Sequence, residues 1–194
     1  SDSSYGYRPK RSGQQAIEKV KEYAEEGYRY AVSVDLSKYF DTLNHELLMN
    51  LLHRKIQDMR ILRIIKKYLK SGVMENGVVS KTEEGSPQGG PLSPLLANIY
   101  LNEFDWEMHS RGVKTVRYAD DIVVFAKSKR AAERLLESSR RYLEGKLKLK
   151  MNTEKSKVTS IFAVKEFKFL GFCIGRNGSG IYIRAHRKSL NKAK

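Results

Sequence analysis

With 194 residues, 40% of them hydrophobic and 10% aromatic, the chain can bury a core, which excludes a disordered basic protein. Its 37 Lys and Arg residues outnumber 22 Asp and Glu residues, which gives a formal net charge of +15. An excess of this size predicts a polyanionic partner, nucleic acid first and an anionic membrane surface second, with a merely basic surface as the simpler alternative.

The cysteine content and the apolar runs indicate where the protein acts. A single cysteine, Cys173, excludes an internal disulfide and a cysteine-based zinc cluster, as expected in a reducing compartment. No apolar run approaches the length of a membrane span and no signal peptide is visible, so we expect no membrane partner. Because the chain opens with Ser1 rather than Met, we expect a piece of a longer protein.

The chain begins with an irregular basic and aromatic segment, residues 5–11. Such a segment could hold a nucleic-acid strand by phosphate pairing and stacking, and a simple turn explains it equally well. Ser12 then predicts a helix N-cap, with Gln15 completing a capping box. Apolar residues follow at helical spacing, and Gly27 is the predicted end of this helix.

Residues 28–36 predict a β-strand. Val32 and Val34 point to one face, and the alternate residues up to Asp35 point to the other. This second face is small and polar and ends in a carboxylate, which is typical of a strand that lines an active-site cleft. A cap at the strand end is the alternative explanation for Asp35.

Two amphipathic helices are predicted next, with Thr42 or Asn44 as the cap of the first and Asp58 as the cap of the second. Their apolar stripes consist of Leu47, Leu48, Leu51 and Leu52, and of Ile61, Leu62, Ile64, Ile65 and Leu69. Asn76-Gly77 then predicts a short hairpin over residues 73–81.

Residues 85–94 contain three of the four prolines and three of the fourteen glycines. Such a loop keeps its backbone accessible and fairly rigid, which suits close approach to a nucleotide or a template; a surface loop before a helix is the alternative. Ser93 predicts the cap of the following helix, with Pro94 at its first position. The apolar side of that helix consists of Leu96, Tyr100, Phe104 and Met108.

The most informative segment is Tyr118-Ala119-Asp120-Asp121, between two β-favouring runs that predict the arms of a tight hairpin, residues 113–117 and 122–126. Two adjacent carboxylates at such a turn repel each other, and burial raises their pKa values unless a cation compensates. The segment indicates either a surface turn or part of a two-metal phosphoryl-transfer site. The second interpretation needs another carboxylate on a neighbouring strand, and Asp35 is the candidate.

The remaining segments complete an α+β order. They predict a helix over 128–143, a stretch of alternating Lys and apolar residues from 146, a hairpin with arms 167–174 and 180–183, and a basic tail, residues 184–194. The expected architecture is an antiparallel sheet backed by helices.

Six segments in this order resemble the palm of reverse transcriptases, and most closely the proteins that bacterial group II introns encode. They are residues 4–9, 34–41, 85–94, 117–121, 152–157 and 169–172. The resemblance spans essentially the whole chain and implies a right-hand polymerase palm with a ferredoxin-like or RRM-like core. It implies four divisions: a junction between fingers and palm (1–27), the palm with its catalytic carboxylates (28–166), a primer-grip hairpin (167–183) and the start of a thumb connection (184–194).

The resemblance also implies a metal site. Asp35 and Asp120 would hold two Mg²⁺ ions, which Mn²⁺ can replace, with Asp121 as a supporting ligand and the Leu36 carbonyl as a further oxygen. One ion would activate the primer 3′-hydroxyl while the other clamps the triphosphate and the leaving pyrophosphate. Lys155 matches the residue proposed to protonate that pyrophosphate.

Other contacts follow from the same resemblance. Phe40 would be the aromatic gate under the sugar of the incoming nucleotide, although one member of the Tyr39-Phe40 pair is expected to be a core residue. Further nucleotide contacts are implied for Leu36, Gln88 and Tyr118. Contacts with nucleic acid are implied for Arg8, Pro87, Gly89, Leu170 and Gly171.

The implied activity is RNA-directed DNA synthesis from deoxynucleoside triphosphates on an RNA template and a DNA primer. The parent protein would act in the bacterial cytoplasm, where it would also be a splicing maturase for group II intron RNA. A non-catalytic RNA-binding module and a retron, diversity-generating or CRISPR-linked enzyme stay open as alternatives. The family's upstream fingers strands and its thumb are missing from these residues, so we expect them alone to polymerise weakly or not at all, with self-association open.

Overall fold

The structure is a computed structural model that describes residues 1–70, 73–75, 78–80 and 92–186. Its helices are α1 (Gly13–Glu25), the 3-10 turn η1 (Tyr39–Asp41), α2 (His45–His53), α3 (Met59–Lys70), α4 (Ser93–Ser110) and α5 (Lys129–Gly145). Its strands are β1 (Tyr30–Val34), β2 (Val73–Glu75), β3 (Val78–Ser80), β4 (Thr115–Tyr118), β5 (Asp121–Ala126), β6 (Lys157–Ser160), β7 (Phe172–Asn177) and β8 (Gly180–Ala185).

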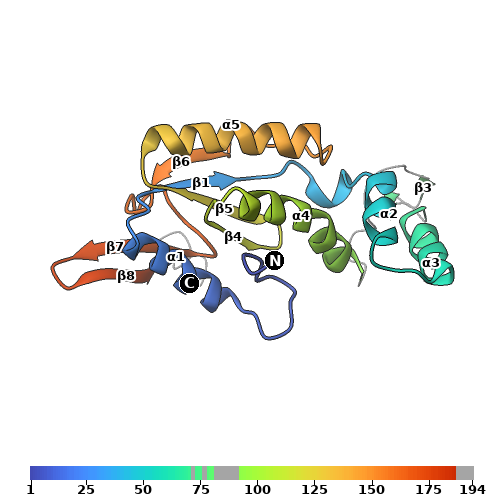
Figure 1. Ribbon diagram of the computed structural model, residues 1–194, viewed down its shortest axis with the longest axis horizontal. Coiled ribbons are helices and arrows are strands. Elements are labelled where there is room, and N and C mark those ends of the chain that lie inside the picture. Colours follow the sequence, from blue (N-terminus) through green and yellow to red (C-terminus); the bar gives the residue numbers. More distant parts are fainter. Residues whose placement is uncertain (71–72, 76–77, 81–91, 187–194) are drawn as a thin grey trace.

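A four-stranded antiparallel sheet in the order β4-β5-β1-β6 forms the centre of the molecule (Figure 1). β2 pairs with β3, and β7 pairs with β8, in two separate hairpins. Helices α4 and α5 pack on one face of the sheet, and α1 with the β7–β8 hairpin packs on the other. The predicted α+β architecture with an antiparallel sheet is confirmed.

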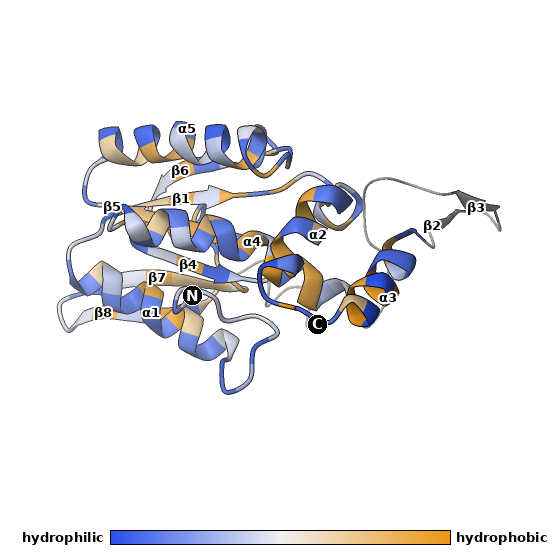
Figure 2. Ribbon diagram, turned by 45° about the vertical axis from the view of Figure 1, so that its right-hand side comes forward, coloured by the Kyte–Doolittle hydropathy of each residue, from blue (hydrophilic) through white to orange (hydrophobic). Residues whose placement is uncertain are grey.

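The first hydrophobic core lies between the sheet and helices α2 to α5. Val32 and Val34 of β1 contribute to it, as their alternation in the strand predicts. The ring of Tyr100 is fully buried here, and its hydroxyl donates a hydrogen bond to the carbonyl oxygen of Leu147 at 2.6 Å. In Figure 2 the side of α5 that faces the sheet is hydrophobic and its outer side is hydrophilic.

The opposite face of the sheet carries a second core, which corrects one prediction. Ala31, Val123 and Phe125 are buried there with Ile17 and Val20 of α1. The small residues on this face of β1 therefore make room for a packed helix and do not line an open cleft along the strand. The polar residues of this face, half-buried Ser33 and then Asp35, lie toward the end of the strand.

Several helices begin at the caps that the sequence predicts. Ser12 and Gln15 form the predicted capping box of α1, and the Asn44 side chain accepts from the Leu47 N–H at 2.9 Å. Asp58 accepts from the Arg60 N–H at the start of α3. Helix α4 differs, because Ser93 is its first residue and not its cap. The Ser93 hydroxyl is buried and lies 3.0 Å from the Tyr68 hydroxyl.

Helix α3 buries a narrower stripe than the sequence predicts. Leu62, Ile65 and Leu69 are buried, whereas Ile61 and Ile64 are 46% and 64% exposed. The helix contacts its neighbours along a single line of residues spaced three and four apart, and the flanking isoleucines lie beyond that line. The hairpin predicted over residues 73–81 is present as β2 and β3. Within the part of the chain that the structure describes, no helix combines the length and apolar character that crossing a bilayer requires.

Candidate functional site

Strand pairing brings the two sources of carboxylates together. Val34 of β1 lies opposite Ile122 of β5. Asp35 directly follows the first of these residues, and Asp121 directly precedes the second, so both acidic residues lie at the same end of neighbouring strands. Asp120 lies beside them in the turn between β4 and β5. The arrangement that the two-metal interpretation requires, a further carboxylate on a neighbouring strand, is present.

The carboxyl groups at this end of the sheet act on one another. Burial raises the pKa of the Asp121 carboxyl, and the negative charges of Asp120 and Asp35 raise it further. Lys168 acts in the opposite direction and lowers this pKa. No pattern in the sequence indicates Lys168, because this residue comes from the segment before β7 and reaches the site only through the fold. A bound cation at this position would relieve the repulsion among the carboxylates.

Leu36 supplies a candidate oxygen ligand through its backbone. On the side of β6, the Ser37 N–H donates to the Lys150 carbonyl at 2.9 Å, and the Asn152 N–H donates to the Asp35 carbonyl at 2.8 Å. Because successive residues of a strand direct their peptide groups to opposite sides, the Leu36 carbonyl is directed toward the side of β5. That is the side on which the acidic turn lies.

The side chains alone do not form a closed metal cage. Within residues 1–70 and 92–186, no group of three or more His, Cys, Asp or Glu side chains is arranged to hold a metal ion. Mg²⁺ commonly uses one or two protein carboxylates and completes its shell with waters and substrate phosphates. Two carboxylates, a backbone carbonyl and a raised pKa at Asp121 fit an ion bound in this open manner.

Lys155 lies in a loop that is fixed to the same strand end. The Asn152 side chain accepts from the backbone N–H groups of Glu154 and Lys155 at 3.1 Å and 3.2 Å. The next residue, Ser156, is hydrogen-bonded to the backbone of Asp35. The Lys155 side chain is exposed, and its loop is held beside the carboxylates.

The structure separates the roles of Tyr39 and Phe40. Tyr39 is 3% exposed, and its hydroxyl donates to the Ala97 carbonyl at 2.5 Å, so it is a core residue. Burial raises its pKa well above the usual value. Phe40 is only partly buried, and its ring lies 5.3 Å from the Tyr39 ring in a tilted arrangement. Of the pair, Phe40 is the residue available to a ligand.

Tyr118, Leu170 and Phe172 line a groove of about 600 Å³ together with residues of α1 and β8. Leu170 and Gly171 both have positive φ angles, 50° and 84°, and form a tight turn. The His186 N–H donates a hydrogen bond of 2.8 Å to the Gly171 carbonyl and holds this turn in place. The two residues implied for the primer grip therefore lie next to the hairpin that carries the acidic residues.

The remaining predicted contacts divide into two groups. The guanidinium of Arg8 donates to the carbonyl of Ser4 at 3.0 Å and to that of Ser1, so its donors hold the N-terminal segment together. Gln88, Pro87 and Gly89 lie outside the described residues.

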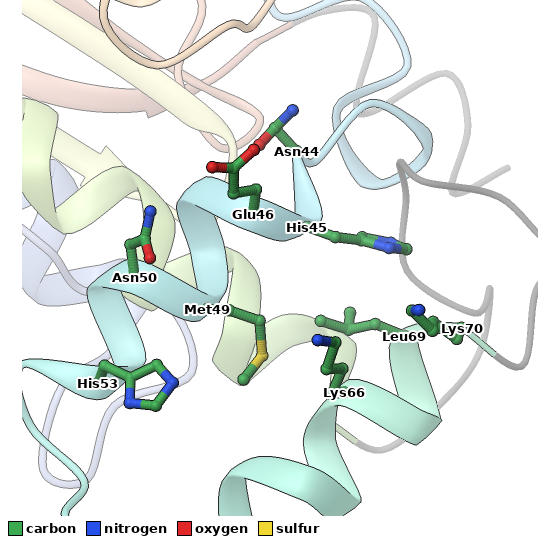
Figure 3. A pocket seen from close by; sticks show the side chains of 9 residues that line it. All are labelled: Asn44, His45, Glu46, Met49, Asn50, His53, Lys66, Leu69 and Lys70. Carbon is green, nitrogen blue, oxygen red and sulfur yellow. The ribbon is translucent and has the colours of Figure 1, made fainter.

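A cavity of about 450 Å³ between α2 and α3 was not predicted from the sequence. Figure 3 shows side chains from both helices around it, among them Met49, His53, Lys66 and Leu69. The sequence pattern assigns these residues to the apolar stripes and solvated faces of two separate helices, so it does not indicate a shared cavity. None of the predicted site residues lines it.

An antiparallel sheet covered by helices, with acidic residues at a hairpin turn and at the end of the adjacent strand, defines a polymerase-palm class of protein. The profile of the family described as reverse transcriptase (RNA-dependent DNA polymerase) matches residues 1–174. The chain belongs to this family, which confirms the resemblance.

Individual relatives agree with this assignment. The YkfC protein of Escherichia coli is 36% identical over 91% of this chain, and the group II intron-encoded protein LtrA of Lactococcus lactis is 30% identical over 95%. The chain spans 56% and 41% of the lengths of these two relatives. Among solved structures, an apo telomerase from Candida tropicalis covers 95% of this chain, and the chain covers 41% of it, with a TM-score of 0.70 at 13% identity, which shows the fold alone.

Proposed function

We propose that this chain supplies the catalytic palm of an RNA-directed DNA polymerase. The observation that carries the proposal is the meeting of Asp35, Asp120 and Asp121 at one end of the sheet, in a chain of the reverse transcriptase family. The substrates would be deoxynucleoside triphosphates, a DNA primer and an RNA template. The reaction would be the transfer of a nucleotide to the primer 3′-hydroxyl.

Asp35 and Asp120 would hold two Mg²⁺ ions, or Mn²⁺ in their place, with Asp121 and the Leu36 carbonyl in support. The raised pKa of Asp121 and the direction of the Leu36 peptide support this ligand set. When bound, such ions activate an attacking hydroxyl and stabilise the negative charge that develops on a leaving group.

The other predicted site residues would bind the nucleotide, orient the primer end and protonate the leaving pyrophosphate. Phe40, as the less buried member of its pair, would lie under the sugar of the incoming nucleotide, and Tyr118 would contact the same nucleotide. The turn of Leu170 and Gly171 would position the primer end, which is why residues 167–183 are assigned as a primer grip. Lys155 would give a proton to the leaving pyrophosphate, and Gln88 with its loop would contact the nascent base pair.

The relatives support a role in the group II intron lineage. LtrA is by name a group II intron-encoded protein, and the matching yeast protein that is 37% identical over 53% of this chain is named for an intron of COX1. We therefore propose that the parent protein binds group II intron RNA as a maturase and acts in the bacterial cytoplasm. The net charge of +15 supports binding to RNA.

The test is primer extension on an RNA template by the full-length parent protein. Asp35→Asn and Asp120→Asn should each lower the rate by about 100-fold or more, since charge stabilisation by a bound metal is worth several kcal/mol. Glu133→Gln, which changes an exposed carboxylate on α5, should leave the rate unchanged. Near-normal extension by either Asp variant would refute the assignment. A wild-type parent that binds intron RNA but extends no primer would favour the non-catalytic module.

A further inference from the structure

A buried ion pair lies directly behind the acidic turn. Arg117, the last residue but one of β4, is 1% exposed, and Asp105 of α4 is 0% exposed. The guanidinium Nε donates to Asp105 Oδ1 at 2.8 Å, and Nη2 donates to Oδ2 at 2.7 Å. This two-bond arrangement fixes the plane of the guanidinium and compensates its charge.

The remaining nitrogen of Arg117 reaches the turn itself. Nη1 donates to the carbonyl oxygen of Ala119 at 2.8 Å and to Asn98 Oδ1 at 2.8 Å. Ala119 has a φ of 56°, in the left-handed region that a residue with a Cβ adopts at a cost of roughly 1 kcal/mol. Its carbonyl belongs to the peptide bond that leads into Asp120, so a hydrogen bond to this oxygen restrains the backbone that aims the Asp120 carboxyl.

The N-terminal segment, residues 1–8, is hydrogen-bonded to both Asn98 and Arg117. The Asn98 amide donates to the Gly6 carbonyl at 2.7 Å, and the Tyr5 N–H donates to the Arg117 carbonyl at 2.8 Å. A Cβ at Gly6 would lie only 2.5 Å from the Ala119 nitrogen, so the segment packs directly against the turn. The Arg117 side chain thus links the turn to helix α4, and the N-terminal segment is joined to this network through Asn98 and through the backbone of Arg117.

Stabilisation of the fold alone does not explain why an arginine occupies position 117. Replacing a buried ion pair by apolar residues of similar volume is often neutral for stability, so the pair alone gives no reason for an arginine at this position. The cation that acts on the Asp121 carboxyl is Lys168 and not Arg117, whose charge Asp105 already compensates. Arg117 acts on the turn through the backbone of Ala119.

We propose that Arg117 is a positioning residue that, oriented by Asp105 and linked through Asn98, fixes the Ala119-Asp120 peptide in the direction that metal binding requires. This inference rests on the proposed function, because it assigns a task to the turn only if Asp120 holds a metal ion. It goes beyond that function, because Arg117 would contact neither the metal nor a substrate.

The test measures Mn²⁺ affinity of the 194-residue chain by paramagnetic relaxation, together with its unfolding in urea. In the double variant Arg117→Met/Asp105→Leu, which replaces the ion pair by apolar side chains, the Mn²⁺ dissociation constant should rise by about 10- to 100-fold while the chain stays folded. The matched control Arg140→Met/Glu137→Leu removes an exposed two-bond pair on α5 and should leave Mn²⁺ affinity unchanged.

Asn98→Ala covers the case in which the double variant does not fold, because it removes only the link between Arg117 and the Gly6 carbonyl. It should weaken Mn²⁺ binding in the same direction. A folded variant of either kind that binds Mn²⁺ as tightly as the unchanged chain would overturn the proposal.

Hydrogen exchange separates this inference from the proposed function. If Asp35→Asn leaves Mn²⁺ binding unchanged, the metal site is wrong, and amide exchange at residues 119–121 then decides the role of Arg117. Faster exchange at these amides in the double variant, with unchanged exchange in the other strands, would support the restraint by Arg117. Unchanged exchange at 119–121 would refute it.

Discussion

The Ser156 hydroxyl is hydrogen-bonded to both backbone groups of Asp35. Its Oγ accepts from the Asp35 N–H at 3.0 Å and donates to the Asp35 carbonyl at 3.3 Å. The hydroxyl supplements the backbone bond from the Asn152 N–H to the same carbonyl, and β1 ends at Val34 although the sequence predicts a strand to residue 36. The same contact ties the loop of Lys155 to the residue that carries the first carboxylate.

Ser156→Ala should therefore affect both stability and activity. Because Ser156 is 7% exposed, loss of its hydroxyl should lower the free energy of unfolding by about 1 kcal/mol. Primer extension by the full-length parent should fall as well, since the Asp35 backbone loses a restraint. Ser160→Ala removes a single 3.3 Å bond from the Phe162 N–H and is the control. Equal activity losses in the two variants would contradict a specific role for Ser156.

The contrast between Tyr39 and Phe40 gives a second prediction. Tyr39→Phe should cost about 1 kcal/mol of unfolding free energy, because the buried Ala97 carbonyl loses its donor, and should leave sugar discrimination unchanged. Phe40→Ala should instead raise ribonucleotide incorporation by the parent protein relative to deoxynucleotide incorporation, because an aromatic ring under the sugar excludes a 2′-hydroxyl by volume. Steady-state incorporation of both nucleotide types measures the effect. Discrimination that stays unchanged in Phe40→Ala would remove the gate assignment.

The sequence predicted most features that depend on local chemistry. The capping box of Ser12 and Gln15 and the acidic hairpin involve residues close in the chain, so spacing rules find them. The sequence indicates Asp35 because one face of its strand is small and polar and ends in this carboxylate.

Features that depend on packing between distant elements could not be predicted in the same way. Arg117 meets Asp105 only because α4 crosses behind β4, and Lys168 reaches Asp121 only because the segment before β7 folds back toward the turn. Likewise, the small residues of β1 indicate an open cleft when the strand is considered alone. Whether this face of the sheet is covered depends on elements outside the strand, α1 and the β7–β8 hairpin. Ala31 is buried in the second core together with residues of α1 for this reason.

Helix α3 offers a test of the corrected packing. Leu62→Ala should destabilise the chain by about 2–5 kcal/mol, because Leu62 is 2% exposed in the first core. Ile64→Ala removes a similar volume from a side chain that is 64% exposed and should change stability by less than about 0.5 kcal/mol. Urea unfolding of the two variants measures the difference. Comparable losses would mean that Ile64 is buried and that the narrow stripe is wrong.

Tyr23 predicts a loss of stability at alkaline pH. Burial between α1 and the sheet, followed by the neighbouring Tyr5, raises the pKa of Tyr23 to about 12. The folded-state pKa lies above the unfolded value of about 10, so folding favours the neutral phenol. This contribution to stability is complete below pH 10 or so and is lost as pH rises toward about 12.

Tyr23→Phe should therefore unfold like the unchanged chain at neutral pH and resist alkaline unfolding better. Circular dichroism of urea unfolding across this pH range measures the difference in stability, and the difference in tyrosinate absorbance between the two proteins follows the ionisation of Tyr23 among the eleven tyrosines. The neutral-pH measurement is the internal control, because the substitution removes only a hydroxyl. Parallel pH dependence in both proteins would show that Tyr23 does not ionise in the range expected for it.

The net charge of +15 leads to a prediction about binding that is independent of catalysis. An RNA–DNA duplex should bind the 194-residue chain through phosphate contacts, and its affinity should fall by roughly 100-fold or more between about 50 mM and 200 mM salt, because bound counterions are released on association. Fluorescence anisotropy with a labelled duplex measures the slope. Asp35→Asn should bind at least as tightly as the unchanged chain without added metal, since it removes one negative charge. Affinity that ignores salt would mean that stacking or base contacts, and not the basic surface, hold the duplex.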